Sequence, residues 1–188
     1  MNWSSNIKHI GQCLQHLSAH NSTKDISADE AFERLLDMTM EIKKQKNTIF
    51  LIGNGASASM ASHVAADLAK NAHVHTEVFS DLSLITAIAN DTSYEEVFAE
   101  PLRRRMKKGD MLVAISSSGQ SPNILRAARE AKTLGGLIIT LSAMNAENEL
   151  RGLGHLNFYI PASTYGMAET CHAATLHYWI DKMLASAN

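Results

Sequence analysis

Cysteine and proline are scarce in this sequence, and long apolar runs are missing. The 188 residues include two cysteines, Cys13 and Cys171, which cannot build the multi-disulfide framework of small secreted domains. No apolar run approaches the roughly 20 residues that a membrane-spanning helix needs. The first residues, MNWSSNIKHIGQ, lack the charged start and apolar stretch of a secretory signal. We therefore expect a cytoplasmic protein without a membrane segment.

An excess of charge of one sign is also missing. Lys and Arg number 17 against 19 Asp and Glu, so the formal net charge is −2 and gives no reason to expect nucleic-acid binding. One basic run, residues 103–108, is typical of a solvated helix end, although it could instead meet an acidic partner or nucleic acid. The hydrophobic fraction of 45% is enough for a complete core, and the length suits one domain spanning residues 1–188.

Short apolar segments alternate with helical periodicity over most of the chain. Residues 1–46 are predicted to be helical, and residues 47–188 are predicted to form an α/β core. Continuous β-branched runs, typical of strands buried on both faces, occupy residues 48–52, 111–115 and 137–141, with weaker candidates at 75–79 and 156–160. Helical patterns cover residues 58–71, 94–107, 122–134 and 167–186. This alternation predicts a doubly wound, five-stranded parallel sheet with an N-terminal helical extension.

Two strand-to-helix loops have compositions suited to binding an anion. Residues 53–59 (GNGASAS) follow one predicted strand, and residues 116–121 (SSSGQS) follow another. Glycine permits close backbone approach to a ligand, and a helix N-terminus attracts phosphate. Neither loop has the Lys of a P-loop or a full GxGxxG pattern, which disfavours a dinucleotide site. Serine and glycine also occur in ordinary turns and caps, but four hydroxyls in six residues favour a small-molecule phosphate site.

Histidine is unusually frequent, with nine residues, and it is the commonest metal ligand. His63 and Asp67 are four residues apart on a predicted helix, so their side chains share one face and can bind a cation or share a proton. Such a pair is more often a solvated surface pair. Glu169 and His177 are two turns apart on the last helix, about 80° around its axis, and can converge if another element contributes. His172 is about 140° from His177, which favours a packing role.

The order of these motifs resembles the sugar isomerase (SIS) domain: strand, GNGxSxS, helix, then Ala-Asn-Asp, then strand, SSSGxS, helix. The length and the GNG loop are similar to those of phosphoheptose isomerases. These enzymes convert sedoheptulose 7-phosphate into D-glycero-D-manno-heptose 7-phosphate for lipopolysaccharide or capsule precursors, by proton transfer through an enediol. The resemblance implies that the substrate and its phosphate bind at Asn54, Gly55, Ser57, Asp91, Ser116, Ser117, Ser118 and Ser121.

The same resemblance assigns roles to the histidines and carboxylates. In this family a His, and a Glu one turn later, follow the GNG loop, and a Gln and a His on the final helix complete a zinc site. These positions fall on His63, Asp67, Glu169 and His177, with Asp67 and His177 as the acid/base pair. Asp67 is one methylene shorter than the family's Glu, and Glu169 adds a negative charge where the family has Gln. Zinc is therefore the expected cofactor, and the N-terminal helices are expected to build a homotetramer.

Two non-catalytic alternatives stay open beside the isomerase. The replication-initiator-associating branch of the SIS superfamily is similar around the GNG and Asn-Asp segments, but it lacks the acid/base carboxylate and the final-helix His. The other alternative is a sugar-phosphate sensor without turnover. The presence of Asp67 and His177 favours the isomerase over the adaptor. A phosphorylated sugar is the expected small-molecule partner.

Overall fold

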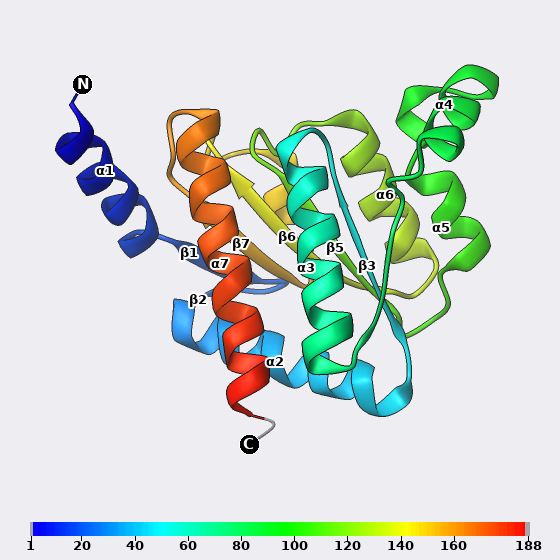
Figure 1. Ribbon diagram of the computed structural model, residues 1–188, viewed down its shortest axis with the longest axis horizontal. Helices are drawn as coiled ribbons and strands as arrows, with labels where there is room; N and C mark the ends of the chain where they lie inside the picture. The colour runs from blue at the N-terminus through cyan, green and yellow to red at the C-terminus, as the bar shows by residue number, and fades with distance from the viewer. Residues whose placement is uncertain (1, 187–188) are drawn as a thin grey trace.

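A central sheet is covered by helices on both faces in the computed structural model, which describes residues 2–186 (Figure 1). The strands are β1 (Ser18–Asn21), β2 (Asp25–Ile26), β3 (Thr48–Gly53), β4 (His75–Val78), β5 (Met111–Ser116), β6 (Leu137–Ala143) and β7 (Leu156–Ile160). The helices are α1 (Trp3–Gln15), α2 (Ala28–Gln45), α3 (Ala56–Ala72), α4 (Leu82–Asp91), α5 (Ala99–Arg105), α6 (Pro122–Thr133) and α7 (Tyr165–Ala185), with short 3₁₀ helices η1 (Tyr94–Glu96) and η2 (Glu149–Gly152). Within the described range, no helix has the length and apolar character needed to cross a bilayer.

The sheet has the order β2-β1-β7-β6-β5-β3-β4, in which β3 to β7 run parallel. These are the five strands predicted from the sequence, so the α/β class and the doubly wound parallel arrangement are confirmed. The sheet also contains β1 and β2, an antiparallel hairpin that adds to the β7 edge. The sequence of β1, SAHN, gives no strand pattern of its own, and this segment becomes a strand by pairing with β7.

Two helical predictions need correction. The segment 1–46 is not helical throughout, because the β1–β2 hairpin separates α1 from α2. The predicted helix at residues 94–107 is divided into η1 and α5, and α5 begins two residues before Pro101. Proline lacks an N–H group and is accommodated in the first turn of a helix, which explains why α5 starts there.

Each face of the sheet has its own apolar core. Ile49 and Leu51 of β3 pack beneath α2, α3 and α7, whereas the intervening Phe50 and Ile52 pack beneath α4, α5 and α6. Because both faces are covered, these strands have continuous apolar sequences instead of alternating ones. The arrangement brings α3 and α7 side by side on one face of the sheet (Figure 1).

Candidate active site

The two predicted anion loops meet at the carboxyl edge of the sheet. β3 and β5 are neighbouring parallel strands, with Gly53 opposite Ile115, so the loops that follow them are adjacent. Gly53 has no room for a side chain, since a Cβ atom would lie 2.6 Å from Ser57. Gly55 has φ = +55°, a conformation that favours glycine, and it begins α3 without a side-chain cap. The start of α3 therefore lies beside the serine loop, although the N–H groups of Ser57 and Ala58 already donate to the carbonyl oxygens of Asn54 and Gly55.

A cavity of about 190 Å³ lies between these loops and the start of α7. Inside it, Ser116 Oγ is 3.2 Å from Ser121 Oγ and 3.5 Å from Ser118 Oγ. Hydroxyl groups at the N-terminus of α6 can donate to an anion, and the helix dipole adds positive potential there. The cavity is lined by Asn54, Ser57, Ile115, Ser116, Ser117, Ser118, Ser121, Tyr165 and Glu169.

The side-chain amide of Asn54 connects the two loops. Its Nδ2 donates to Asn123 Oδ1 at 3.0 Å, and its Oδ1 accepts from Asn123 Nδ2 at 2.9 Å. The Tyr94 hydroxyl donates to the same Oδ1 at 3.2 Å. Sequence reasoning missed both partners. The only signal for Asn123 was its place two residues after the serine loop, and nothing in the sequence marked Tyr94.

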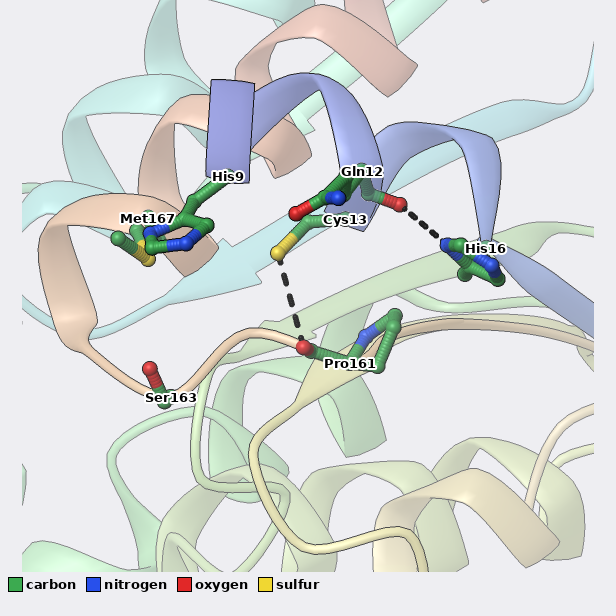
Figure 2. A pocket seen from close by; sticks show the side chains of 7 residues that line it. All are labelled: His9, Gln12, Cys13, His16, Pro161, Ser163 and Met167. Carbon is green, nitrogen blue, oxygen red and sulfur yellow. Dashed lines mark hydrogen bonds between the residues drawn. The ribbon is translucent and has the colours of Figure 1, made fainter. Parts of the chain in front are cut away.

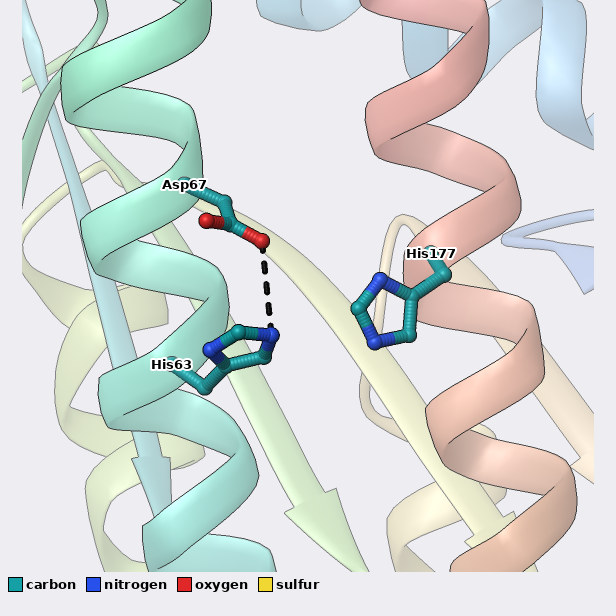
Figure 3. A group of neighbouring side chains, drawn as sticks. All are labelled: His63, Asp67 and His177. Atoms are coloured by element: carbon teal, nitrogen blue, oxygen red, sulfur yellow. Dashed lines mark ion pairs between the residues drawn. The ribbon is translucent and has the colours of Figure 1, made fainter.

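A cluster of titratable side chains lies between α3 and α7 (Figure 3). His63 and Asp67 come from α3 and His177 from α7, and each offers a ligand atom within 4.8 Å of the other two. His63 Nε2 is 3.4 Å from Asp67 Oδ2, and the rings of His63 and His177 have centroids 5.3 Å apart. Both imidazoles are exposed, and Asp67 is half-buried. Such a set can transfer protons or hold a metal ion.

One predicted zinc ligand, Glu169, lies outside this cluster, and two predicted substrate-binding residues, Gly55 and Asp91, do not line the cavity. Glu169 is two turns from His177, about 12 Å along α7, and lines the serine cavity instead of joining the cluster. Asp91 is exposed at the end of α4, and Gly55 is exposed at the start of α3. Neither Asp91 nor Gly55 is among the lining residues of the cavity.

The helices α3 and α7 each contribute to both the cavity and the cluster. On α3, Ser57 lines the cavity, and His63 follows six residues later, about 9 Å along the helix axis. On α7, Glu169 lines the cavity and His177 belongs to the cluster. A ligand that places an anionic group among the serines can therefore extend along these two helices towards the cluster.

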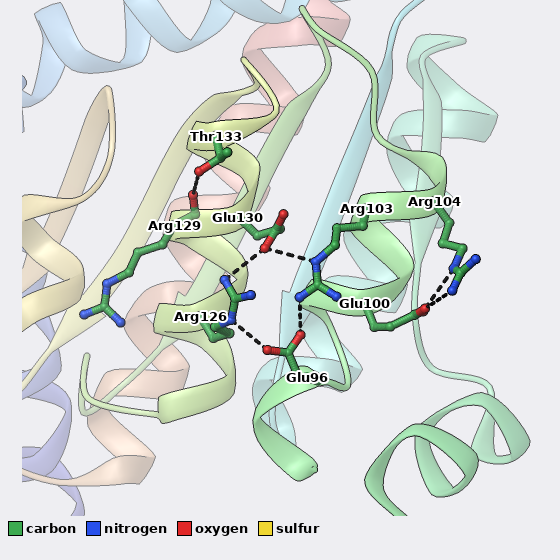
Figure 4. A network of polar contacts seen from close by, with 8 residues as sticks. All are labelled: Glu96, Glu100, Arg103, Arg104, Arg126, Arg129, Glu130 and Thr133. Carbon is green, nitrogen blue, oxygen red and sulfur yellow. Dashed lines mark hydrogen bonds and ion pairs between the residues drawn. The ribbon is translucent and has the colours of Figure 1, made fainter. Parts of the chain in front are cut away.

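The basic run in α5 is paired with acidic side chains (Figure 4). Arg103 pairs with Glu96 and, at 3.1 Å, with Glu130, while Arg126 pairs with the same two carboxylates at 2.7 and 2.9 Å. Burial acts to raise the pKa of Glu96, but hydrogen bonds from Arg126 and Arg103 hold it below its usual 4.5. This network fastens η1, which carries Tyr94, to α5 and α6.

A larger cavity, of about 690 Å³, lies between α1 and the segment before α7 (Figure 2). It is lined by His9, Gln12, Cys13, His16, Pro161, Ser163 and Met167. Here Cys13 Sγ donates to the Pro161 carbonyl oxygen at 3.6 Å, and His16 Nδ1 lies 2.8 Å from the Gln12 carbonyl oxygen. Both contacts are made to backbone carbonyl oxygens, and the lining residues include no carboxylate that could form an acid/base pair with a histidine. The smaller serine cavity is the better candidate for catalysis.

Known proteins resemble this chain in sequence and in architecture. The family model for the SIS domain matches residues 16–143. A phosphoheptose isomerase of Helicobacter pylori strain P12 is 32% identical over 161 residues, which are 82% of this chain and 83% of the relative. Solved phosphoheptose isomerases of Neisseria gonorrhoeae and Francisella tularensis have TM-scores of 0.81 and 0.84 at 22% and 20% identity. They cover 96% and 97% of this chain and 96% and 98% of their own. The chain belongs to the phosphoheptose isomerase family of SIS-domain proteins.

Proposed function

We propose that this protein is an aldose–ketose isomerase that converts sedoheptulose 7-phosphate into D-glycero-D-manno-heptose 7-phosphate. The observation that carries the proposal is a hydroxyl-lined anion cavity joined by two helices to a His/Asp/His cluster. The offset of about 9 Å between Ser57 and His63 suits a sugar whose phosphate and carbonyl are at opposite ends. An extended chain advances about 1.2 Å per bond, so a seven-carbon sugar phosphate has the required reach.

The proposed chemistry moves a proton between C1 and C2 through an enediol. Asp67 removes the proton from carbon, and His177 moves a proton at the substrate oxygen. Asp67 suits the role of base because its side chain is only 26% exposed and is partly shielded from water. The serine hydroxyls and the N-terminus of α6 hold the phosphate. This remote binding supplies the energy that keeps the reacting carbons beside Asp67 and His177.

Zinc is the proposed cofactor of this site. Two imidazoles and a carboxylate are ligands that catalytic zinc sites use. Ligand atoms around a tetrahedral zinc lie about 3.4 Å apart, in agreement with the 3.4 Å between His63 Nε2 and Asp67 Oδ2. His177 would be the third ligand, and Glu169 would not take part. Bound zinc supplies a Lewis acid for the substrate carbonyl.

The proposal extends to assembly and location. We propose one SIS domain over residues 1–188, with residues 1–46 as the oligomerisation segment of a homotetramer and residues 47–188 as the α/β core. Trp3 and Ile7, which are 75% and 47% exposed on α1, supply apolar contact surface for this assembly. The reaction would take place in the cytoplasm and supply precursors of lipopolysaccharide or capsule.

Turnover of sedoheptulose 7-phosphate by the purified protein, with and without added zinc, tests the proposal. His177→Ala should lower kcat by at least about a hundredfold, because general acid–base groups contribute roughly 10²–10⁴-fold. His75→Ala is the matched control, since this exposed His is the first residue of β4. It therefore lies at the amino ends of the parallel strands, whereas the cavity lies at their carboxyl ends. This control variant should retain full activity. An unchanged rate for His177→Ala would refute the site, and no turnover of any ketose phosphate would favour the sensor.

A further inference from the structure

We propose that Asn123 and Tyr94 are positioning residues that fix the orientation of the Asn54 amide, so that Asn54 offers the substrate an N–H donor. The inference rests on the proposed function, because it takes the ligand of the serine cavity to be a phosphorylated sugar. Asn54 is held by side chains from two other elements, α6 and η1. The roles predicted for the site residues do not account for these contacts.

The orientation is set at Asn123, which is 2% exposed in the first turn of α6. Its Oδ1 accepts the backbone N–H of Ile124 at 3.0 Å. A backbone N–H can only donate, so the oxygen of Asn123 must face Ile124 and its nitrogen must face away. Asn123 Nδ2 then donates to Asn54 Oδ1, and Asn54 Nδ2 donates back to Asn123 Oδ1.

The hydrogen bonds leave Asn54 with one kind of free group. Its Oδ1 accepts from both Asn123 and Tyr94, which fills the two lone pairs of an amide oxygen. Its Nδ2 carries two hydrogens, and only one of them is used by Asn123. Because Asn54 lines the cavity, the remaining N–H is what it can present to a ligand there.

An N–H donor is the group that a phosphate or sugar oxygen requires. A rotated Asn54 amide would turn its oxygen towards an anion, and the interaction would become repulsive. Tyr94 is 55% exposed, and its backbone is held by the ion-pair network of Glu96. The donor is therefore oriented before the substrate arrives, which avoids a reorganisation cost on binding.

A double-mutant cycle between Tyr94 and Asn54 tests this role. The measurements are KM and kcat for sedoheptulose 7-phosphate, with calorimetric affinity for inorganic phosphate. Tyr94→Phe should raise KM about three- to tenfold with kcat changed less than about twofold, because a ground-state contact is lost. In the Asn54→Ala background, Tyr94→Phe should have almost no further effect. Equal effects in both backgrounds would overturn the inference, because Tyr94 would then act independently of Asn54.

Asn123→Asp gives a second, independent variant. Aspartate keeps the acceptor for Ile124 but cannot donate to Asn54 Oδ1, so the Asn54 amide can rotate. We expect the affinity for inorganic phosphate or for the sugar phosphate to fall about tenfold or more, with an unchanged thermal midpoint. Tyr178 is exposed on α7, and the control variant Tyr178→Phe should behave as wild type. Unchanged affinity for both ligands in a folded Asn123→Asp protein overturns the inference.

The two ligands separate this inference from the proposed function. A protein that binds inorganic phosphate but turns over no sugar phosphate would refute the isomerase, while its phosphate affinities would still decide the role of Asn123 and Tyr94. Effects on the sugar phosphate alone would place the Asn54 donor at a sugar oxygen and support the inference. A wild-type protein that binds neither ligand would overturn both.

Discussion

Three histidines on α3 and α7 have very different surroundings. His63 and His177 are exposed beside Asp67, where an imidazole can exchange protons. His172 is completely buried, with Nε2 3.2 Å from the Ser142 carbonyl oxygen, and its Nδ1 has no hydrogen-bond partner in the described part of the chain. Burial lowers the pKa of His172 to about 4, so this side chain is neutral at physiological pH. It fills the core, the packing role predicted from its angle of about 140° to His177 on the last helix.

We predict that His172 makes the fold sensitive to acid. Its pKa of about 4 in the folded protein lies below the usual 6.5, so the unfolded chain binds the additional proton. The contribution of neutral His172 to the free energy of unfolding is fully present above pH 6.5. It is lost as the pH falls towards 4 and amounts to at most about 3 kcal/mol. His172→Gln should flatten this part of the profile, measured as the free energy of unfolding in urea. Parallel profiles for wild type and variant would contradict the assignment.

Glu169 places a carboxylate among the hydroxyls of the serine cavity, where we propose that the phosphate binds. We predict that Glu169→Gln tightens the binding of inorganic phosphate about three- to tenfold, because it removes a like-charge repulsion of about 1 kcal/mol. Zinc content should not change, since Glu169 is two turns from His177 on α7. Calorimetry and metal analysis measure the two effects. Loss of zinc from this variant would show that Glu169 is a ligand after all.

The 3₁₀ helix η1 is held partly by charge. None of its own three residues is buried, although the next two residues, Val97 and Phe98, pack in the apolar core. Glu96 connects η1 to Arg103 of α5 and Arg126 of α6. A network in which one half-buried carboxylate has two partners holds an element more firmly than a single surface pair does. This network adds to the core packing of Val97 and Phe98 in holding Tyr94 beside Asn54.

We predict that Glu96→Gln loosens η1. Amide hydrogen exchange should accelerate in residues 93–98, KM should rise, and the free energy of unfolding should fall by about 1–2 kcal/mol. Glu100→Gln is the matched control, because Glu100 pairs in the same region with Arg104, whose side chain is 74% exposed. Its effect should stay within about 0.5 kcal/mol. Equal exchange in both variants would show that the network does not position η1.

At the scale of the whole molecule, helix α1 packs against the rest of the protein with one of its faces and exposes another. Ile10, Cys13 and Leu14 of α1 pack against the start of α7, while Trp3 and Ile7 remain exposed. Figure 1 shows α1 at the edge of the molecule, beyond the β7 side of the sheet. An amphipathic helix with such exposed apolar residues is suited to contact another copy of the chain.

We predict that the Trp3→Lys, Ile7→Lys double variant dissociates the proposed homotetramer. Lysine would bring charge into an apolar contact, so the mass measured by light scattering at micromolar concentration should fall to that of a dimer or monomer. Leu82→Lys is the control, because Leu82 is 74% exposed on α4, far along the chain from α1. An unchanged mass for the double variant would remove α1 from the interface.

The parts of the fold and of the site that could be predicted are those marked by a pattern among residues close together in the sequence. The parallel strands were recognised because burial on both faces requires continuous apolar runs, as in β3 and β5. The two loops that line the cavity stood out because each directly follows a buried strand and because four hydroxyls in six residues exceed what turns and helix caps require. The β1–β2 hairpin was missed because its pairing with β7 joins segments more than 130 residues apart. Asn123 and Tyr94 were missed because their contacts with Asn54 also join segments that are distant in sequence, by 69 and 40 residues.

The sequence by itself determined the five parallel strands, the glycine- and serine-rich loops that follow β3 and β5, and the shared face of His63 and Asp67, because each depends on residues close together in the chain. Only the tertiary structure decided which partners meet across the molecule. It brought His177 to the α3 pair, placed Glu169 in the serine cavity, and set Tyr94 and Asn123 on Asn54. Such contacts depend on how helices pack on the sheet, which periodicity and composition do not specify.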